Sequence, residues 1–90
     1  MVKKRNRIDI IHDMLAAIQN KGGRIKPTHL MYKANLSHGL MQSYLEELIG
    51  KEMIQKMDNN NNTYLIITDR GHSFIEKFRQ MKEFEKTFGL

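Results

Sequence analysis

The chain contains no cysteine, no tryptophan and only one proline among its 90 residues. Without cysteine it can form neither a disulfide nor a thiolate-held zinc site. Its apolar runs are only a few residues long, which argues against a membrane-spanning helix and against a signal peptide. We therefore expect a single-domain cytoplasmic protein that has no membrane partner.

Acidic residues are missing from a long internal stretch, between Asp13 and Glu46. The cationic and imidazole side chains of that stretch are Lys21, Arg24, Lys26, His29, Lys33 and His38. Further cations near the N-terminus are Lys3, Lys4, Arg5 and Arg7. The net charge is +5 and the isoelectric point is about 9.6. This uneven distribution indicates a polyanionic partner such as nucleic acid.

Signatures of catalysis and metal binding are also missing. The histidines, His12, His29, His38 and His72, are too far apart in sequence to suggest a metal site. The pair Gly22-Gly23 is a helix terminator and not a glycine-rich phosphate loop. We expect a protein that is not an enzyme and that takes no cofactor, no metal and no small-molecule substrate.

Helical periodicity predicts a first helix from about residue 7 to residue 20. Asn6 is a suitable N-cap, and the glycine pair at 22 and 23 ends the helix. Residues 24–26 are too short to assign alone, but they are compatible with a small edge strand. A second, short helix is predicted from residue 27 or 28 to Ala34, because proline is tolerated in a first helical turn.

The best helix of the chain is predicted from its cap Ser37 to residue 49 or 50. Its expected apolar side consists of Leu40, Met41, Tyr44, Leu45, Leu48 and Ile49. A turn of residues 35–37 separates it from the preceding short helix. These two helices and their turn form a predicted helix-turn-helix.

Two strands are predicted next, at residues 53–57 and 63–67, joined by a soft polar tip with the sequence DNNNN at 58–62. A final helix from Thr68 to Phe88 is about 30 Å long at 1.5 Å per residue. The expected fold is mainly α with a small β-hairpin, in the order α-(β)-α-α-β-β-α, and ends in a long helix.

The polar side of the 37–49 helix carries uncharged hydrogen-bonding groups. Ser37, His38, Gln42 and Ser43 can donate to and accept from base edges, and a helix fits the major groove of duplex DNA. The alternative is an ordinary solvated surface on which Ser37 is only a cap. Further along, Glu46 and Glu47 are expected to point away from this side, since carboxylates near phosphate are repelled.

Two segments carry a family resemblance. YKANLSHGLMQSYLEELIGKEMI and TYLIITDRGHSFIEKF resemble the small archaeal winged helix-turn-helix DNA-binding proteins of the ten-kilodalton type. The matching features are the YKANLS turn, the YLEELI core run and the Thr68-x-x-Gly71 helix start, and the resemblance spans about residues 7 to 88. It implies double-stranded DNA binding by a homodimer whose last helices pack antiparallel as a coiled coil. The implied role is a transcriptional regulator or an architectural protein of the nucleoid.

The expected division is a winged domain with a basic arm at residues 1–70 and a dimerisation helix at 71–90. The predicted DNA contacts are Lys4, Arg5, Lys26, Thr28, Lys33, Asn35, Ser37, His38, Gln42, Ser43, Lys51, Lys56 and Asn60. The predicted dimer contacts are Phe74, Phe78, Met81, Phe84 and Phe88, of which the first two are also expected to pack on the first helix.

Two departures from the family pattern stand out. Such sequences usually carry glycine just before the first wing strand, where this chain has Glu52. The wing tip also lacks the basic residues that many wings place against phosphate. The alternative function is therefore a winged helix that binds other proteins without contacting DNA.

Overall fold

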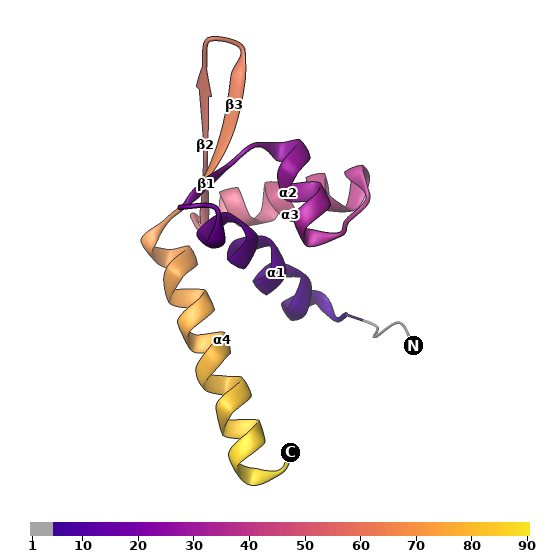
Figure 1. The fold of residues 1–90 in the computed structure, drawn as a ribbon, viewed down its shortest axis with the longest axis vertical. Coiled ribbons are helices and arrows are strands. Elements are labelled where there is room, and N and C mark those ends of the chain that lie inside the picture. The colour runs from indigo at the N-terminus through magenta and orange to yellow at the C-terminus, as the bar shows by residue number, and fades with distance from the viewer. Residues whose placement is uncertain (1–4) are drawn as a thin grey trace.

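The computed structural model describes residues 5–90 as four helices and a three-stranded antiparallel sheet (Figure 1). The elements are α1 (Arg7–Asn20), β1 (Arg24–Ile25), α2 (Pro27–Ala34), α3 (His38–Gly50), β2 (Ile54–Asn59), β3 (Asn62–Ile67) and α4 (Asp69–Phe88). The strand order in the sheet is β1-β3-β2. The predicted class, a mainly helical α+β fold with a hairpin and a long last helix, is confirmed.

Local side-chain caps explain where the helices begin. Asn6 Oδ1 accepts a hydrogen bond from the Asp9 N–H at 2.8 Å, and the Asp9 carboxylate accepts one from the Asn6 N–H at 3.3 Å. Ser37 and Thr68 each accept an N–H from the first turn of α3 and α4 respectively. Each cap satisfies a backbone donor that the helix itself leaves free. All three cap positions predicted from the sequence are confirmed.

The core lies between α1, α2, α3 and the inner face of the sheet. Its largest fully buried side chains are Met14, Leu15, Ile18, Leu30, Met41, Leu48, Ile54 and Leu65. In α3 the buried residues Met41, Leu45 and Leu48 define the inward side. The prediction that Leu40 shares this side is wrong: Leu40 is 43% exposed, because it precedes Met41 by one position and points about 100° away around the helix.

The hairpin turn is tighter than the sequence predicted. Asn59 pairs with Asn62, so the turn consists of Asn60 and Asn61, with φ angles of 47° and 67°. Two positive φ angles in a two-residue loop are typical of a type I′ turn, which matches the twist of the flanking strands. The predicted hairpin is confirmed, but the predicted five-residue tip at 58–62 is wrong. The strands continue to Asn59 and Asn62 in a hairpin that projects from the helical body (Figure 1).

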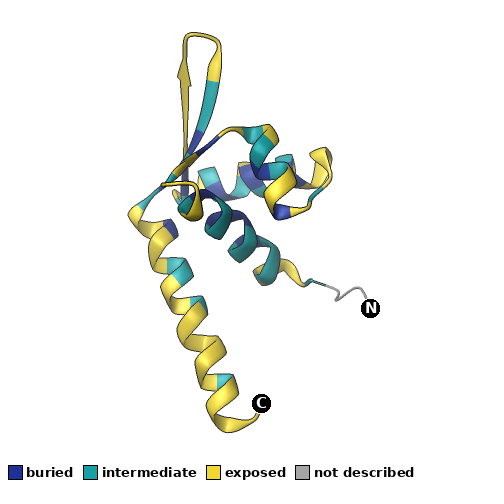
Figure 2. Ribbon diagram, in the orientation of Figure 1, coloured by how far each residue is buried: buried dark blue, intermediate teal, exposed yellow. Residues whose placement is uncertain are grey.

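Helix α4 leaves the domain in the direction opposite to the hairpin (Figure 1). The molecule consequently measures 50 × 30 × 22 Å. Most of α4 is exposed, and only its first half packs on the body, through Gly71, Phe74 and Ile75 (Figure 2). Within residues 5–90, no helix combines the length and the apolar character needed to cross a bilayer.

Candidate nucleic-acid interface

The turn between α2 and α3 is fixed by its own backbone. Asn35 ends α2 in the left-handed conformation, with φ 55° and ψ 57°, and the Leu36 N–H donates to the Met31 carbonyl at 3.0 Å. Ser37 then caps α3 through the Leu40 N–H at 3.3 Å. Asparagine tolerates the left-handed region better than most residues, so this sequence suits the turn. The result is a defined angle between the two helices and an exposed first turn of α3.

The outer side of α3 carries the predicted base-reading residues. His38 and Ser43 are exposed, and Gln42 is half-buried. Glu46 is also exposed, and it lies four residues after Gln42 and three after Ser43, which places it on the same side of the helix. The prediction that Glu46 points away from this side is therefore wrong. A single carboxylate stands among uncharged hydrogen-bonding groups.

Glu47, in contrast, is turned away from this side, as predicted. Its carboxylate accepts hydrogen bonds from the guanidinium of Arg7, at the start of α1, and from Lys51 Nζ at 2.8 Å. The predicted DNA contact Lys51 thus shares one carboxylate, one helical turn earlier, with Arg7, and the three groups together keep one positive charge. The bond from Arg7 to Glu47 ties the end of α3 to α1. The sequence of α3 itself contains no lysine or arginine.

The predicted contacts of α2 fall on two different sides of that helix. Thr28 and Asn35 are exposed on one side, together with Tyr32, which is 74% exposed. Tyr32 is absent from the sequence-predicted contacts, although its place off the buried stripe of Leu30 and Ala34 could have revealed it. A phenol ring and hydroxyl at this position are suited to contact a sugar-phosphate backbone.

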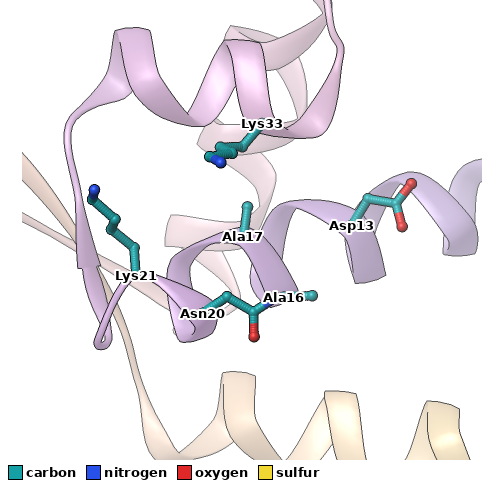
Figure 3. A pocket seen from close by; sticks show the side chains of 6 residues that line it. All are labelled: Asp13, Ala16, Ala17, Asn20, Lys21 and Lys33. Atoms are coloured by element: carbon teal, nitrogen blue, oxygen red, sulfur yellow. The ribbon is translucent and has the colours of Figure 1, made fainter.

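Lys26 and Lys33 lie on the other flank of α2. Lys33 lines a hollow between α1 and α2 of about 460 Å³, whose floor includes Ala16 and Ala17 (Figure 3). The side chains of Lys33 and Lys21 both extend into this hollow (Figure 3). These cations therefore do not surround the outer side of α3 evenly, as the sequence suggested, but gather on the α1 side of α2.

The wing presents one predicted cation toward the helices. Lys56 on β2 is paired with the buried Leu65 on β3, so both side chains point to the face of the sheet that the helices cover. Lys56 lies two residues closer to the hairpin turn than the buried Ile54, and its side chain is exposed. Asn60 occupies the turn itself. The wing can thus place one charge and one amide beside α3.

The N-terminal arm is only partly described. Lys4 lies outside the described residues. The guanidinium of Arg5 donates to Asp13 Oδ2 at 3.0 Å and to the carbonyls of Ala34 and Asn35 at 2.6 and 2.7 Å. Arg5, a predicted DNA contact, is therefore committed within the protein, where it satisfies carbonyl groups at the end of α2 and fixes them to α1.

The predicted dimer contacts on α4 differ in their surroundings. Phe78 is half-buried and stacks on the His12 ring, with centroids 4.0 Å apart, and Phe74 packs against the core. Met81, Phe84 and Phe88 are 42, 58 and 65% exposed. The first pair thus already has neighbours within the protomer, as also expected. The other three form an apolar stripe with little cover.

Two cations of α4 are paired with carboxylates along the helix. Arg79 hydrogen-bonds to the carboxylates of Glu76 and Glu83, three residues earlier and four later. The hydrogen bond and the positive charge of Arg79 lower the pKa of Glu76 below its usual value. Lys82 lies 3.6 Å from Glu85. The other three cations of this helix, Arg70, Lys77 and Lys86, take part in no ion pair within residues 5–90.

Comparisons with known proteins agree with this architecture. Sso10a-2, a DNA-binding protein from Sulfolobus solfataricus, superposes with a TM-score of 0.81 at 18% identity, covering 93% of this chain and 85% of that one. F93 from STIV, a winged-helix DNA-binding protein, superposes with a TM-score of 0.76 at 19% identity, covering 93% and 95%. At these identities the likeness establishes the fold.

Sequence relatives extend the comparison. An uncharacterized protein of Methanocaldococcus jannaschii is 33% identical over 78 residues, which are 87% of this chain. The match covers 34% of that protein, so the chain spans about a third of the relative's length. A model of the winged helix-turn-helix family matches residues 4–86. Because this match includes nearly the whole sequence, the chain belongs to the winged helix-turn-helix family.

Proposed function

We propose that this protein binds double-stranded DNA through the outer side of α3, as a transcriptional regulator or an architectural protein of the nucleoid. The observation that carries the proposal is a capped helix whose exposed side bears hydrogen-bonding side chains and which a fixed turn presents at the surface of a basic protein. Two structures of the same fold belong to proteins described as DNA-binding.

In the proposed complex α3 enters the major groove, which is about 12 Å wide and admits a helix. Gln42 is suited to pair with adenine, and His38 and Ser43 to contact bases or phosphates. Gly39 allows the first turn of α3 to approach a phosphate closely, since no side chain intervenes. Thr28 and Asn35 on α2 contact the flanking backbone, as does Tyr32.

The wing and the last helix complete the proposal. Lys56 and Asn60 contact the backbone beside the groove. Two copies pack through the apolar stripe of α4, which a single protomer leaves exposed. A two-fold axis then presents two α3 helices to the two halves of a pseudo-palindromic site.

A second candidate is a winged helix that binds another protein. Glu46 on the outer side of α3 and the absence of cations from the turn Asn60-Asn61 favour it, because neither feature attracts phosphate. The chain's acid-free stretch from residue 14 to residue 45 favours nucleic acid.

The test is fluorescence anisotropy with a random duplex pool at two salt concentrations. We expect log K to fall with log salt by about 0.9 per neutralised phosphate. Gln42→Ala should reduce the preference among sequences selected from the pool, by about 1–3 kcal/mol at one base position. Glu46→Gln should strengthen binding to all sequences, since it removes a carboxylate that faces phosphates.

Gln55→Ala is the matched control, because Gln55 is exposed on the outer face of the sheet, opposite Ile66. It should leave both affinity and preference unchanged. Salt-independent or undetectable duplex binding by the wild-type protein would reject the proposal in favour of the protein-binding candidate. Unchanged sequence preference in Gln42→Ala would reject the assignment of α3 as the reading helix.

A further inference from the structure

The cations in the described part of the chain divide into two groups. Arginines and lysines paired with a carboxylate within 4 Å are Arg5, Arg7, Lys51, Arg79 and Lys82. Within residues 5–90, the other eight take part in no such pair; four of them, Lys21, Arg24, Lys26 and Lys33, come from the acid-free stretch, and the remaining four are Lys56, Arg70, Lys77 and Lys86. The four from the acid-free stretch lie close together in the fold, because they line two hollows that share Lys21.

Helix α2 brings part of this group together. Lys26, His29 and Lys33 are spaced at i, i+3 and i+7, so they follow one flank of the helix. Lys21 and Arg24 come from the loop and strand that lead from α1 to α2. We call these five residues the Lys21 belt. The members of the belt along α2 lie on a different side of that helix from Thr28, Tyr32 and Asn35.

Two hollows open along the belt, and Lys21 lines both. The first, between α1 and α2, holds Lys21 and Lys33 beside Asn20 (Figure 3). The second has a volume of about 660 Å³, and its lining includes Arg24, Lys26, His29 and Tyr64. Asp13, at the far end of the first hollow, is bound to Arg5. The belt therefore consists of donors and cations without an internal counter-charge at its centre.

Tyr64 holds two of these cations near each other. The guanidinium carbon of Arg24 lies 4.5 Å from the centre of the Tyr64 ring, and Lys26 Nζ lies 5.8 Å from it. Contacts of this kind attract a cation to the face of an aromatic ring. Like charges so placed repel one another, and an anion between them removes that repulsion. The ring thus positions both side chains at the edge of the second hollow.

We infer that the Lys21 belt is a phosphate-binding site, separate from the outer side of α3. Lysine and arginine with a nearby hydroxyl and amide are the donors that proteins use for phosphate. Helix α2, which carries His29 and Lys33 and is preceded by Lys26, comes directly before α3 in the helix-turn-helix. If the duplex supplies the phosphate, the belt binds the backbone that flanks the groove occupied by α3.

The phosphate has two possible sources, the backbone of a bound duplex or a free phosphate-bearing molecule. The first source rests on the proposed DNA binding, and the second does not. The test compares Lys21→Gln, which affects both hollows, with Lys86→Gln. Lys86 is the matched control, since it is exposed on α4 and belongs to no ion pair in the described part of the chain.

For the duplex source, log K falls as salt rises, and Lys21→Gln should reduce the magnitude of that negative slope by about 0.9. Lys86→Gln should leave the slope unchanged. For the free source, pyrophosphate alone is titrated into each protein and followed by amide chemical shifts. Saturable shifts confined to residues 20–33 and 64, lost in Lys21→Gln only, would identify a free ligand.

Either result supports the inference and names the source. An unchanged salt slope in Lys21→Gln together with no saturable pyrophosphate shifts overturns it. That failure is distinguishable from a failure of the proposed function, because Gln42→Ala and the wild-type salt slope report on α3 independently. A protein that binds pyrophosphate at the belt but no duplex would retain this inference and lose the proposed function.

Discussion

At the scale of single residues, Glu52 adopts a backbone conformation that glycine adopts at lower cost. Its φ is 62°, in the left-handed region where a Cβ atom is crowded. The carbonyl of Glu52 accepts a hydrogen bond from Thr68 Oγ1 at 2.6 Å, which fixes this conformation at the junction of α3, the sheet and α4. This chain therefore has Glu52 where the family usually has glycine, yet its backbone keeps the left-handed conformation that glycine adopts easily.

Glu52→Gly should therefore stabilise the protein by about 0.5–1 kcal/mol, the relief of the left-handed strain less the greater unfolded-state entropy of glycine. Urea unfolding followed by circular dichroism measures the change. Glu52→Ala is the control, because it removes the same carboxylate but keeps the Cβ atom, and it should not stabilise. Equal gains in both variants would assign the effect to charge and contradict the strain argument.

At the scale of elements, α4 begins against the sheet through Gly71. A Cβ atom built on Gly71 would lie 2.6 Å from the Met53 carbonyl oxygen and 2.6 Å from an Ile67 side-chain carbon. Gly71→Ala should therefore destabilise the protein by about 1–3 kcal/mol, because the backbone of α4 must move away from the sheet. Thermal and urea unfolding measure the loss.

Gly50 provides the comparison for this substitution. It is the last residue of α3, and a Cβ atom there would meet nothing within 4 Å. Gly50→Ala should be neutral or stabilising by up to about 1 kcal/mol, the helix propensity difference. If Gly71→Ala were as stable as Gly50→Ala, the close packing of α4 on the sheet would be refuted.

The elements themselves were predictable because their signals are local. Asn6, Ser37 and Thr68 mark three helix starts within a few residues of the apolar periodicity that follows. The turn Asn60-Asn61 was not resolved because every residue of the run 59–62 is an asparagine, so the sequence alone does not show which two form the turn.

The candidate site was less predictable, because it depends on contacts between distant segments. Arg5 bonds to carbonyl groups about thirty residues away, and Glu47 bonds to Arg7 from another helix. The grouping of Lys21 with Lys33 also requires α1 and α2 to pack together. Composition indicated a cationic half, but only the fold shows which cations remain unpaired and on which side of α2 they lie.

At the scale of the whole molecule, the surface separates three features: the outer side of α3, the Lys21 belt and the apolar stripe of α4. The stripe is the one that a protomer cannot bury alone, since α4 extends beyond the body of the domain (Figures 1 and 2). Phe84 and Phe88 lie 4.9 Å apart between ring centroids and are mostly exposed. Burying such a side chain contributes about 1.5–3 kcal/mol.

A second copy of the chain provides that burial in the proposed homodimer. Sedimentation velocity should give a mass near twice 10.6 kDa for the wild-type protein, and Phe84→Gln/Phe88→Gln should sediment as a monomer at the same concentration. Lys86→Gln should remain dimeric, because Lys86 is two residues from Phe84 and Phe88 and lies on a different side of α4. A wild-type monomer at all accessible concentrations would exclude this dimer. The monomeric variant should still bind a duplex with a single half-site, but it should bind a duplex with two half-sites no more tightly than one with a single half-site. This result would identify the α4 contact as the link that couples the two α3 helices in DNA binding.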